Sequence, residues 1–337
     1  MKGTLRQYFI ASVPAAVVGA WNLGDGLLRD LPEAAPIWQL NLLAPLLESE
    51  NLPGNPLVSL ALGASFLLPL LITASVTSRA WAEVFSRAQG RPLDEGWFLS
   101  AWFFVLLLPA TLPLHFAAIG LSFGAVFGCH VFGGSGRYIV NPAVLGIAFV
   151  SISYPDLFAE GRWLPGSDSL SSWALVASDG VEAAAAAGTS WGALLLGHET
   201  GALGTPSALA SILGVAYLIT RKIASTSIVA GGLIGLFVTA GFLGGIPGLW
   251  HLALGNFTFV LAFIATDPTT RPVSSAGGWV YGALFGVLII VLRTADPNHP
   301  EATVSALLLA SLSVPLIDHI AKAVLPAAKA PQILRHD

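Results

Sequence analysis

The stretch 97-WFLSAWFFVLLLPATLPLHFAAIGLSFGAVFG-128 decides what kind of fold this sequence encodes. It runs for 32 residues without a Lys, Arg, Asp or Glu. A single helix of this length would be about 48 Å long, whereas the hydrocarbon core of a bilayer is about 30 Å thick. Pro109 and Pro113 stand in the middle, where a helix is expected to break. We therefore predict a hairpin of two membrane-spanning helices.

The composition of the whole chain agrees with a membrane protein. Of 337 residues, 55% are hydrophobic and 10% are charged, whereas soluble domains carry about 25% charged residues. The apolar runs have the lengths of helices, and backbone groups in lipid must be satisfied within their own segment. We therefore expect an all-α integral membrane protein. Ten spans are predicted, at residues 5–22, 56–77, 97–112, 114–131, 142–154, 204–220, 225–243, 248–265, 277–293 and 301–321.

Lys and Arg are distributed unevenly between the two predicted sides of the membrane. With the N-terminus inside, only Arg29, Arg162 and Arg293 of the 15 basic residues lie in outer segments. This distribution follows the positive-inside rule. With an even number of spans, it predicts a multi-pass protein of the inner membrane with both termini in the cytoplasm. The net charge of −4 therefore gives no indication of nucleic acid binding.

The predicted spans divide into two groups of five around a long outer segment. We predict a first half at 1–154, an extracytoplasmic segment at 155–203, a second half at 204–321 and a cytoplasmic tail at 322–337. An odd number of spans per half inverts one half relative to the other if the two share a fold, as in many transporters. The Ser, Gly and Ala content of the outer segment indicates a mobile link, with one short helix over 182–196.

A glycine-rich turn precedes the fifth predicted span, in 132-FGGSGRYIVNPAVLGIAF-149. Its glycines are Gly133, Gly134 and Gly136. Glycines permit a tight turn with backbone N–H groups pointing inward, and Arg137 beside them would hold an anion such as a flavin phosphate. Asn141 and the proline after it are a typical helix start. A simple capped turn between two helices is the alternative interpretation.

Two other places carry polar groups that suggest chemistry. Thr266 and Asp267 end the eighth predicted span, where an aspartate would bind a cation or cap the turn while facing Arg271. Cys129 is the single cysteine, and His130 follows it. A metal at an interface with another chain is one interpretation of this pair, but we favour a buried thiol beside an interfacial imidazole. One cysteine excludes an internal disulfide and an iron–sulfur cluster that this chain ligates alone.

In order and spacing, several motifs resemble those of one membrane-protein family, NqrB/RnfD. Its members are subunits of the sodium-pumping NADH:quinone oxidoreductase and of the Rnf electron-transport complex. The motifs are the glycine-rich turn with its Asn-Pro-Ala, 91-RPLDEGWFLSAWFFVLLLPATLPLHFAAIGLSFGAVFG-128, 197-GHETGALGTPSALASILGVAYLI-219, 265-ATDPTTRPVSSAGGWVYGALFGVLIIVLR-293 and 315-PLIDH-319. The resemblance implies ten helices in two inverted five-helix halves, similar to urea channels. It also implies a place in a multi-subunit membrane complex that moves electrons through flavins and can couple this to sodium movement.

The resemblance implies cofactors as well. Relatives carry FMN bonded through a phosphodiester to the threonine of a Ser-Gly-Ala-Thr motif in the outer segment, and the quinone-reducing branch also binds riboflavin and quinone. Here Glu182 and three alanines stand in that place, and alanine has no oxygen to carry a phosphodiester. Thr189, four residues beyond the expected position, is the nearest alternative, although an ordinary loop threonine is the simpler interpretation. Thr205 and Ser207 belong to 204-GTPS-207, which lacks the glutamate of the family's Gly-Glu-Thr-Ser.

Two further charged positions of the family are uncharged here, because Cys129 replaces a lysine and Ile147 replaces an arginine. Charged groups retained inside a membrane usually mark a pathway, so their loss argues against an unaltered ion-coupled flavoprotein. We predict a non-autonomous membrane subunit of a flavin-dependent electron-transport complex that works with other membrane subunits. The alternatives are a non-redox channel, carrier or assembly component on the same scaffold, and an electron-delivery component for a specialised biosynthetic enzyme.

Overall fold

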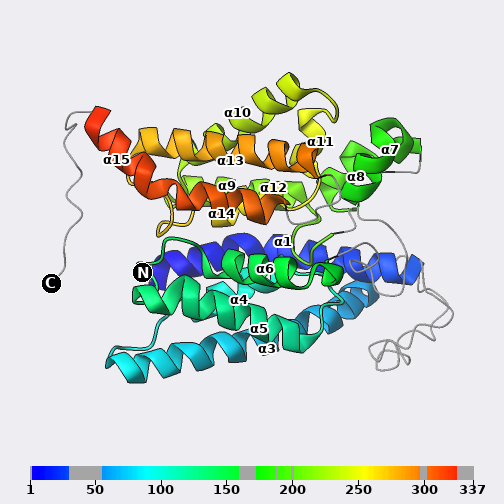
Figure 1. Ribbon diagram of the computed structural model, residues 1–337. Coiled ribbons are helices and arrows are strands. Elements are labelled where there is room, and N and C mark those ends of the chain that lie inside the picture. The colour runs from blue at the N-terminus through cyan, green and yellow to red at the C-terminus, as the bar shows by residue number, and fades with distance from the viewer. Residues whose placement is uncertain are drawn as a thin grey trace.

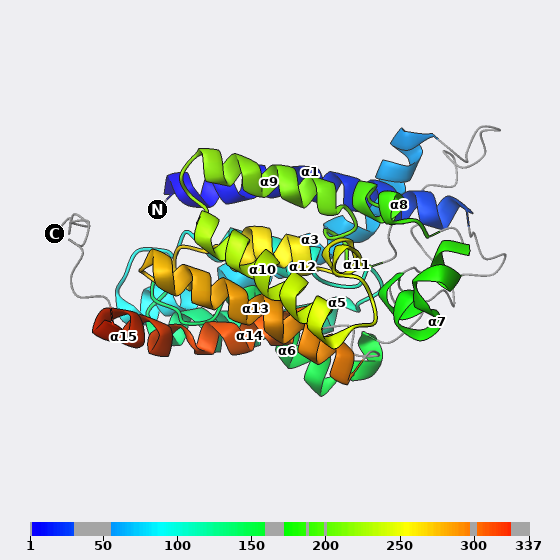
Figure 2. The same cartoon turned by 90° about the horizontal axis from the view of Figure 1, so that it is seen from above.

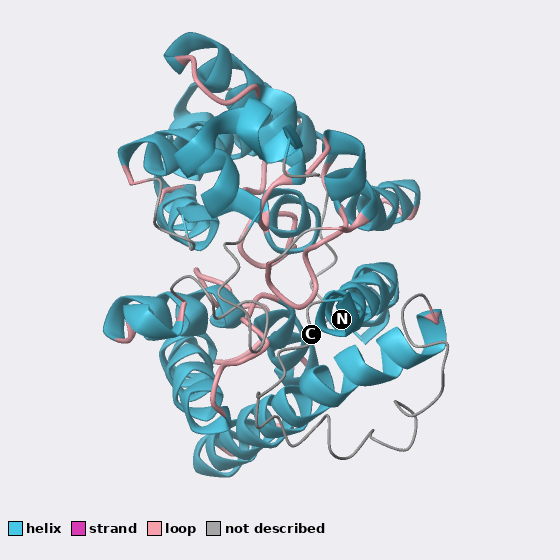
Figure 3. Ribbon diagram, turned by 90° about the vertical axis from the view of Figure 1, so that its right-hand side faces the viewer, coloured by secondary structure: helices cyan, strands magenta, loops and turns pink. Residues whose placement is uncertain are grey.

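The computed structural model describes residues 2–29, 55–158, 172–186, 189–198, 201–296 and 302–324. These ranges fold into helices joined by loops, and they contain no strand (Figure 3). The predicted all-α class is therefore confirmed.

The helices of the first half form one layer of the molecule, the lower one in Figure 1. They are α1 (Lys2–Arg29), α3 (Pro56–Gln89), α4 (Trp97–Leu106), α5 (Leu114–Phe123) and α6 (Pro142–Ser153). α5 continues through a π-helical turn, η1 (Gly124–Cys129), into a short 3-10 turn, η2 (His130–Phe132). The predicted hairpin after Trp97 is present, because α4 ends before the two prolines and α5 begins after them.

The helices of the second half form the other layer. They are α9 (Ala208–Thr220), α10 (Thr226–Leu243), α11 (Gly248–Ala253), α12 (Phe257–Phe259), the π-helical turn η4 (Val260–Ile264), α13 (Ser275–Ala295), α14 (Ala302–Leu312) and α15 (Val314–Val324). The layers meet where α1 packs against α9 and α6 against α14. In Figure 2, α9 lies over α1.

The single helix predicted over 182–196 is wrong, whereas the mobile link stays a prediction because much of the outer segment lies outside the described residues. The described part of the outer segment contains η3 (Pro155–Leu157), α7 (Ser172–Ala186) and α8 (Trp191–Leu196). Trp173 and Val176 of α7 and Leu194 of α8 are buried in one apolar cluster with Ala253 and Leu254, which lie at the end of α11. The prediction failed because the residues that cover these helices come from a distant part of the chain.

All ten predicted spans contain helix, but the helices differ in length. α3, α10, α13 and the continuous helix over Leu114–Phe132 are long and apolar enough to cross a membrane. α14 and α15 together make a fifth such segment if their bend of 41° is counted within one span. The protein is thus a multi-pass membrane protein, while the number ten remains a prediction. Large apolar side chains face outward from these helices, such as Phe242, which is 87% exposed.

Glycines let neighbouring helices approach closely in each half. A Cβ added to Gly282 of α13 would lie 2.2 Å from the carbonyl oxygen of Ile228 in α10, and one added to Gly63 of α3 would lie 1.7 Å from that of Ala20 in α1. Lipid removes most of the hydrophobic driving force between helices, so their association depends on such close packing. The small residues are therefore part of what holds each half together.

We expect Gly282→Ala to destabilise the protein by about 1–3 kcal/mol, because its methyl group would overlap backbone atoms of α10. The measurement is thermal unfolding of purified protein in detergent. Gly241→Ala is the matched control, since no atom lies within 4 Å of a Cβ at that position. Alanine favours the helical conformation over glycine by up to about 1 kcal/mol, so Gly241→Ala should not destabilise the protein. Equal destabilisation by both variants would contradict this account.

Candidate functional site

A cavity of about 260 Å³ lies between the two halves. α1, the start of α4 and the glycine-rich turn line it from the first half, and η4 with the turn after it lines it from the second. Its apolar walls are Leu5, Leu99, Phe103 and Phe263. Its polar groups include Tyr8, Ser135, Tyr138, Asn141, Asp267 and Thr269. The cavity therefore combines aromatic walls with convergent hydrogen-bonding groups.

Asp267 alone contributes a carboxylate among the residues that line the cavity. The Tyr138 hydroxyl and the Asn141 amide donate to its Oδ2 at 2.9 and 3.1 Å. The Thr269 backbone N–H donates to its Oδ1 at 2.9 Å. Burial raises the pKa of Asp267 above its ordinary value, although the three hydrogen-bonding neighbours oppose this shift. These bonds tie the glycine-rich segment of the first half to the turn after η4.

Asp267 caps the turn after η4, as one interpretation predicted, but it forms no ion pair with Arg271. Nη1 of Arg271 instead donates to the carbonyl oxygen of Ile223 at 3.0 Å, and the described residues include no ion pair of Asp267 within 4 Å. The backbone N–H of Arg271 bonds to the carbonyl of Asp267 at 3.1 Å. Although this turn brings the two residues close along the backbone, the guanidinium reaches the α9–α10 loop.

Thr266 is not among the residues that line the cavity, although it precedes Asp267 in the chain. Its hydroxyl donates to the carbonyl of Ala262 at 2.7 Å, and its own carbonyl accepts from the Tyr8 hydroxyl at 2.7 Å. The side chain is fully buried. Thr266 therefore supports the site by fixing the start of α1 to the end of η4.

The glycine-rich turn has the backbone that its sequence requires. Gly133, Gly134 and Gly136 have φ of 105°, 93° and 89°, which is the left-handed region that favours glycine. The Ser135 N–H, however, donates to Asp94 Oδ2 at 2.6 Å, and Arg137 is exposed. A carboxylate of the chain itself thus occupies the place that was predicted for a bound anion.

Asn141 has both of its predicted features. Its Oδ1 caps α6 by accepting from the Ala143 N–H at 3.0 Å, and the proline after it occupies the first turn. Its amide nitrogen reaches Asp267. One residue therefore starts a helix and supports the cavity.

Three other predicted residues lie away from the cavity. Ser207 caps α9 through the Ala210 N–H at 3.1 Å, and the Thr205 hydroxyl donates to the carbonyl of Ala202 at 3.3 Å. Thr189 lies between α7 and α8, where its N–H donates to the carbonyl of Ala184 at 2.9 Å. The structure thus brings Gly136, Asn141 and Asp267 together and leaves these three elsewhere.

The sequence did not indicate the aromatic part of the site. Tyr138 stands between Arg137 and Asn141, so an aromatic residue with a hydroxyl group within the motif was a signal that could have been used. Tyr8 and Phe103 gave no such signal, because their neighbours in the chain belong to ordinary apolar helices. Their role depends on contacts with residues of the second half.

The donors and walls of the cavity fit the ring system of a flavin. Aromatic and apolar side chains suit the faces of a planar ring, and amide, hydroxyl and backbone groups suit its polar edge. The volume of about 260 Å³ is slightly below the roughly 300–1,000 Å³ of sites that bury a drug-sized ligand. The cavity therefore fits a ring, or a cation with its waters, and not a complete flavin nucleotide.

Comparison with known proteins gives one consistent result. The chain matches the model of the NQR2, RnfD, RnfE family over residues 1–325. It is 34% identical to the B subunit of the Na(+)-translocating NADH-quinone reductase of Azotobacter vinelandii, over 95% of this chain and 83% of that protein. The corresponding protein of Neisseria meningitidis is 33% identical, over 96% of this chain and 84% of that protein. The similarity therefore extends through both halves and the outer segment.

We expect Asp267→Asn to change how stability depends on pH. The native pKa of Asp267 lies above the ordinary value of 3.8, so the unfolded chain releases this proton first as pH rises. The free energy of unfolding should therefore fall as pH rises from about 3.8 through the native pKa. Unfolding in detergent across this range should show the fall in the parent protein and a flatter profile in Asp267→Asn.

Asp156→Asn is the control for this experiment, because Asp156 is exposed and lies outside the cavity. A profile of Asp267→Asn that follows the parent and the control at every pH would contradict the assignment.

Proposed function

The chain belongs to the NQR2, RnfD, RnfE family, and we propose that it is a membrane subunit of a flavin-dependent electron-transport complex. The cavity between the two halves carries the proposal, because it places aromatic walls and fixed polar groups where the two layers of helices meet. The relatives are named as one subunit of a Na(+)-translocating NADH-quinone reductase. By analogy, the chain works together with other membrane subunits, and the electron donor and acceptor sites are shared with them.

In this proposal the cavity holds the ring of a non-covalently bound flavin, riboflavin or FMN. A bound flavin would supply the capacity to accept and release one or two electrons. Phe103 and Phe263 of the chain would pack against the ring, and Tyr138 and Asn141 would hold the Asp267 carboxylate beside it. The protein thereby orients the ring and limits the access of water.

Covalent FMN, if present on this chain, is proposed at Thr189. The residue is partly exposed between α7 and α8, as the attachment of a cofactor to its hydroxyl group requires. The family position is occupied by alanine, and the neighbouring Ala184 is fully buried in the cluster that joins α7 to α11. The family's threonine position itself, Ala185, is exposed, so the attachment is lost there because the residue has no hydroxyl group.

Asp267 is the proposed site of coupling to a cation. Sodium prefers oxygen ligands, as hard cations do, and this carboxylate lies on the cavity wall beside a tyrosine and an asparagine. Ile147, which replaces a charged family residue, is fully buried in the apolar core. The proposed coupling therefore depends on fewer charged groups than in the relatives.

We further propose ten spans in two inverted halves, at 1–154 and 204–321, in the inner membrane. Each half contains one π-helical turn, η1 in the fourth predicted span and η4 in the eighth, and each leads toward a turn beside the cavity. The contacts between layers also pair the first helix of one half with that of the other, α1 with α9. The start of α1 and the end of α15 lie at one end of the bundle (Figure 1), which supports the proposal that both termini are cytoplasmic.

The flavin proposal is tested on the complex purified from native membranes with its partners retained. Acid precipitation of the complex should release an amount of flavin proportional to the amount of this chain. Ser100 lines the cavity, so Ser100→Phe should fill it and lower the released flavin by at least about tenfold, whereas Ser100→Ala should not. Ultraviolet fluorescence of the chain on a denaturing gel would reveal covalent FMN, and Thr189→Ala should abolish that signal.

A colourless complex without flavin would contradict the redox proposal and favour a channel, carrier or assembly component. Equal flavin in Ser100→Phe and Ser100→Ala would show that the flavin binds outside the cavity.

A further inference from the structure

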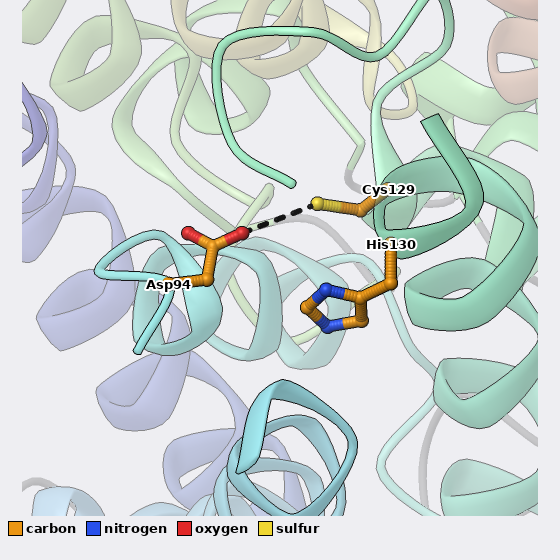
Figure 4. Close-up of side chains that lie close together, drawn as sticks. All are labelled: Asp94, Cys129 and His130. Atoms are coloured by element: carbon orange, nitrogen blue, oxygen red, sulfur yellow. Dashed lines mark hydrogen bonds between the residues drawn. The ribbon is translucent and has the colours of Figure 1, made fainter. Parts of the chain in front are cut away.

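A second cluster of reactive side chains lies beside the glycine-rich turn, outside the cavity. Asp94 comes from the loop between α3 and α4, Cys129 ends η1 and His130 begins η2. A carboxylate oxygen, the thiol sulfur and an imidazole nitrogen all lie within 4.8 Å of one another. Figure 4 shows the three side chains directed toward a common point. They offer the oxygen, sulfur and nitrogen ligands that transition metals use in proteins.

The spacing of two of these atoms matches a metal site closely. Cys129 Sγ lies 3.6 Å from Asp94 Oδ2. In a tetrahedral zinc site with Zn–S of about 2.3 Å and Zn–O of about 2.1 Å, the sulfur and oxygen are about 3.6 Å apart. The two ligands are therefore already separated as zinc requires.

An irregular backbone lets two consecutive residues reach the same point. In a regular α-helix, neighbouring side chains point about 100° apart around the axis. Here the π-helical turn changes into a 3-10 turn at Cys129, whose φ and ψ are −126° and −63°. π-helical turns occur frequently at functional sites. This break directs the thiol and the imidazole toward Asp94.

His130 provides an independent observation that points to a ligand. The residue is 6% exposed, and its ring stacks on Phe85 at 5.1 Å with an interplanar angle of 15°. Its carbonyl oxygen accepts from the Gly133 N–H, but neither ring nitrogen forms a hydrogen bond to the described residues. Among the buried side-chain nitrogens and oxygens of the described residues, only Asn256 Nδ2 lacks a partner, so the unbonded imidazole nitrogens of His130 reach solvent. A ring nitrogen is therefore available to bind a metal beside Asp94 and Cys129.

From these observations we propose that Asp94, Cys129 and His130 bind a divalent transition metal of the zinc class. On binding, the thiol loses its proton to solvent, and the metal takes that proton's place between Sγ and Oδ2. Three protein ligands leave a fourth position for water or for a group of a partner protein. Asp94 is partly exposed, which gives the ion a route of entry.

The site is supported by bonds that orient its ligands. The Gly96 N–H donates to Asp94 Oδ1 at 2.9 Å, and the Ser135 N–H donates to Oδ2 at 2.6 Å. Such outer contacts fix ligand geometry in known metal sites. Arg91, the nearby cation on the same loop, is directed to the carbonyl of Gly133 at 3.3 Å. The metal would thus fasten the glycine-rich turn to the α3–α4 loop, independently of whether the cavity binds flavin.

The test uses Co²⁺ as a spectroscopic probe on purified full-length protein that has been stripped with a chelator. The parent protein should bind one Co²⁺ per chain and show a thiolate-to-cobalt charge-transfer band. Cys129→Ser should lose the band, and His130→Ala and Asp94→Asn should each weaken binding by at least about tenfold. Zn²⁺ should displace the cobalt and remove the band.

His115→Ala is the matched control, because His115 is exposed and its ring contacts Phe116 outside the cluster. It should bind cobalt like the parent. Absence of the band in the parent protein, or an equal band in Cys129→Ser, would overturn the proposal. Loss of the same amount of metal in His115→Ala and His130→Ala would show binding to surface histidines and would overturn it too. Size-exclusion elution in detergent establishes that each variant is folded.

Discussion

The hydrogen bonds that Asp267 accepts from Tyr138 and Asn141 are the constraint on which the central cavity depends. They cross from the second half of the chain to the first, and the bond from Tyr8 to the Thr266 carbonyl adds a second crossing. Asp267 is partly buried, and taking a carboxylate out of water is costly unless its oxygens are satisfied. The two halves therefore have to meet in this arrangement, and the cavity beside Asp267 is the space that their meeting leaves.

Within each half, a different interaction dominates. Glycines of α3 and α13 lie against backbone carbonyls of α1 and α10, so the helices associate by close contact of their backbones. Such packing is rigid and leaves little room for polar side chains. The polar groups that form the two proposed sites lie instead in the turns, at the ends of helices and between the halves. Function is accordingly expected where helices break, as at η1 and η4.

The glycine-rich turn connects the two proposed sites. Ser135 lines the cavity through its position in the turn and donates its N–H to Asp94 in the proposed metal cluster. The positive φ angles of its glycines make this double contact feasible, since residues with a Cβ rarely adopt them. The turn is therefore the structural element that the two proposed sites share.

The sequence by itself determined the membrane class, the helical hairpin after Trp97 and the helix start at Asn141, because apolar length, proline and capping act over a few neighbouring residues. It also indicated Gly136, Asn141 and Asp267 as candidate site residues. It did not determine the partner of Asp267, the packing of α7 or the contribution of Tyr8 to the cavity. Only the tertiary structure decided these, since each depends on a contact between distant segments, and local sequence does not specify which distant side chain will fill a given space.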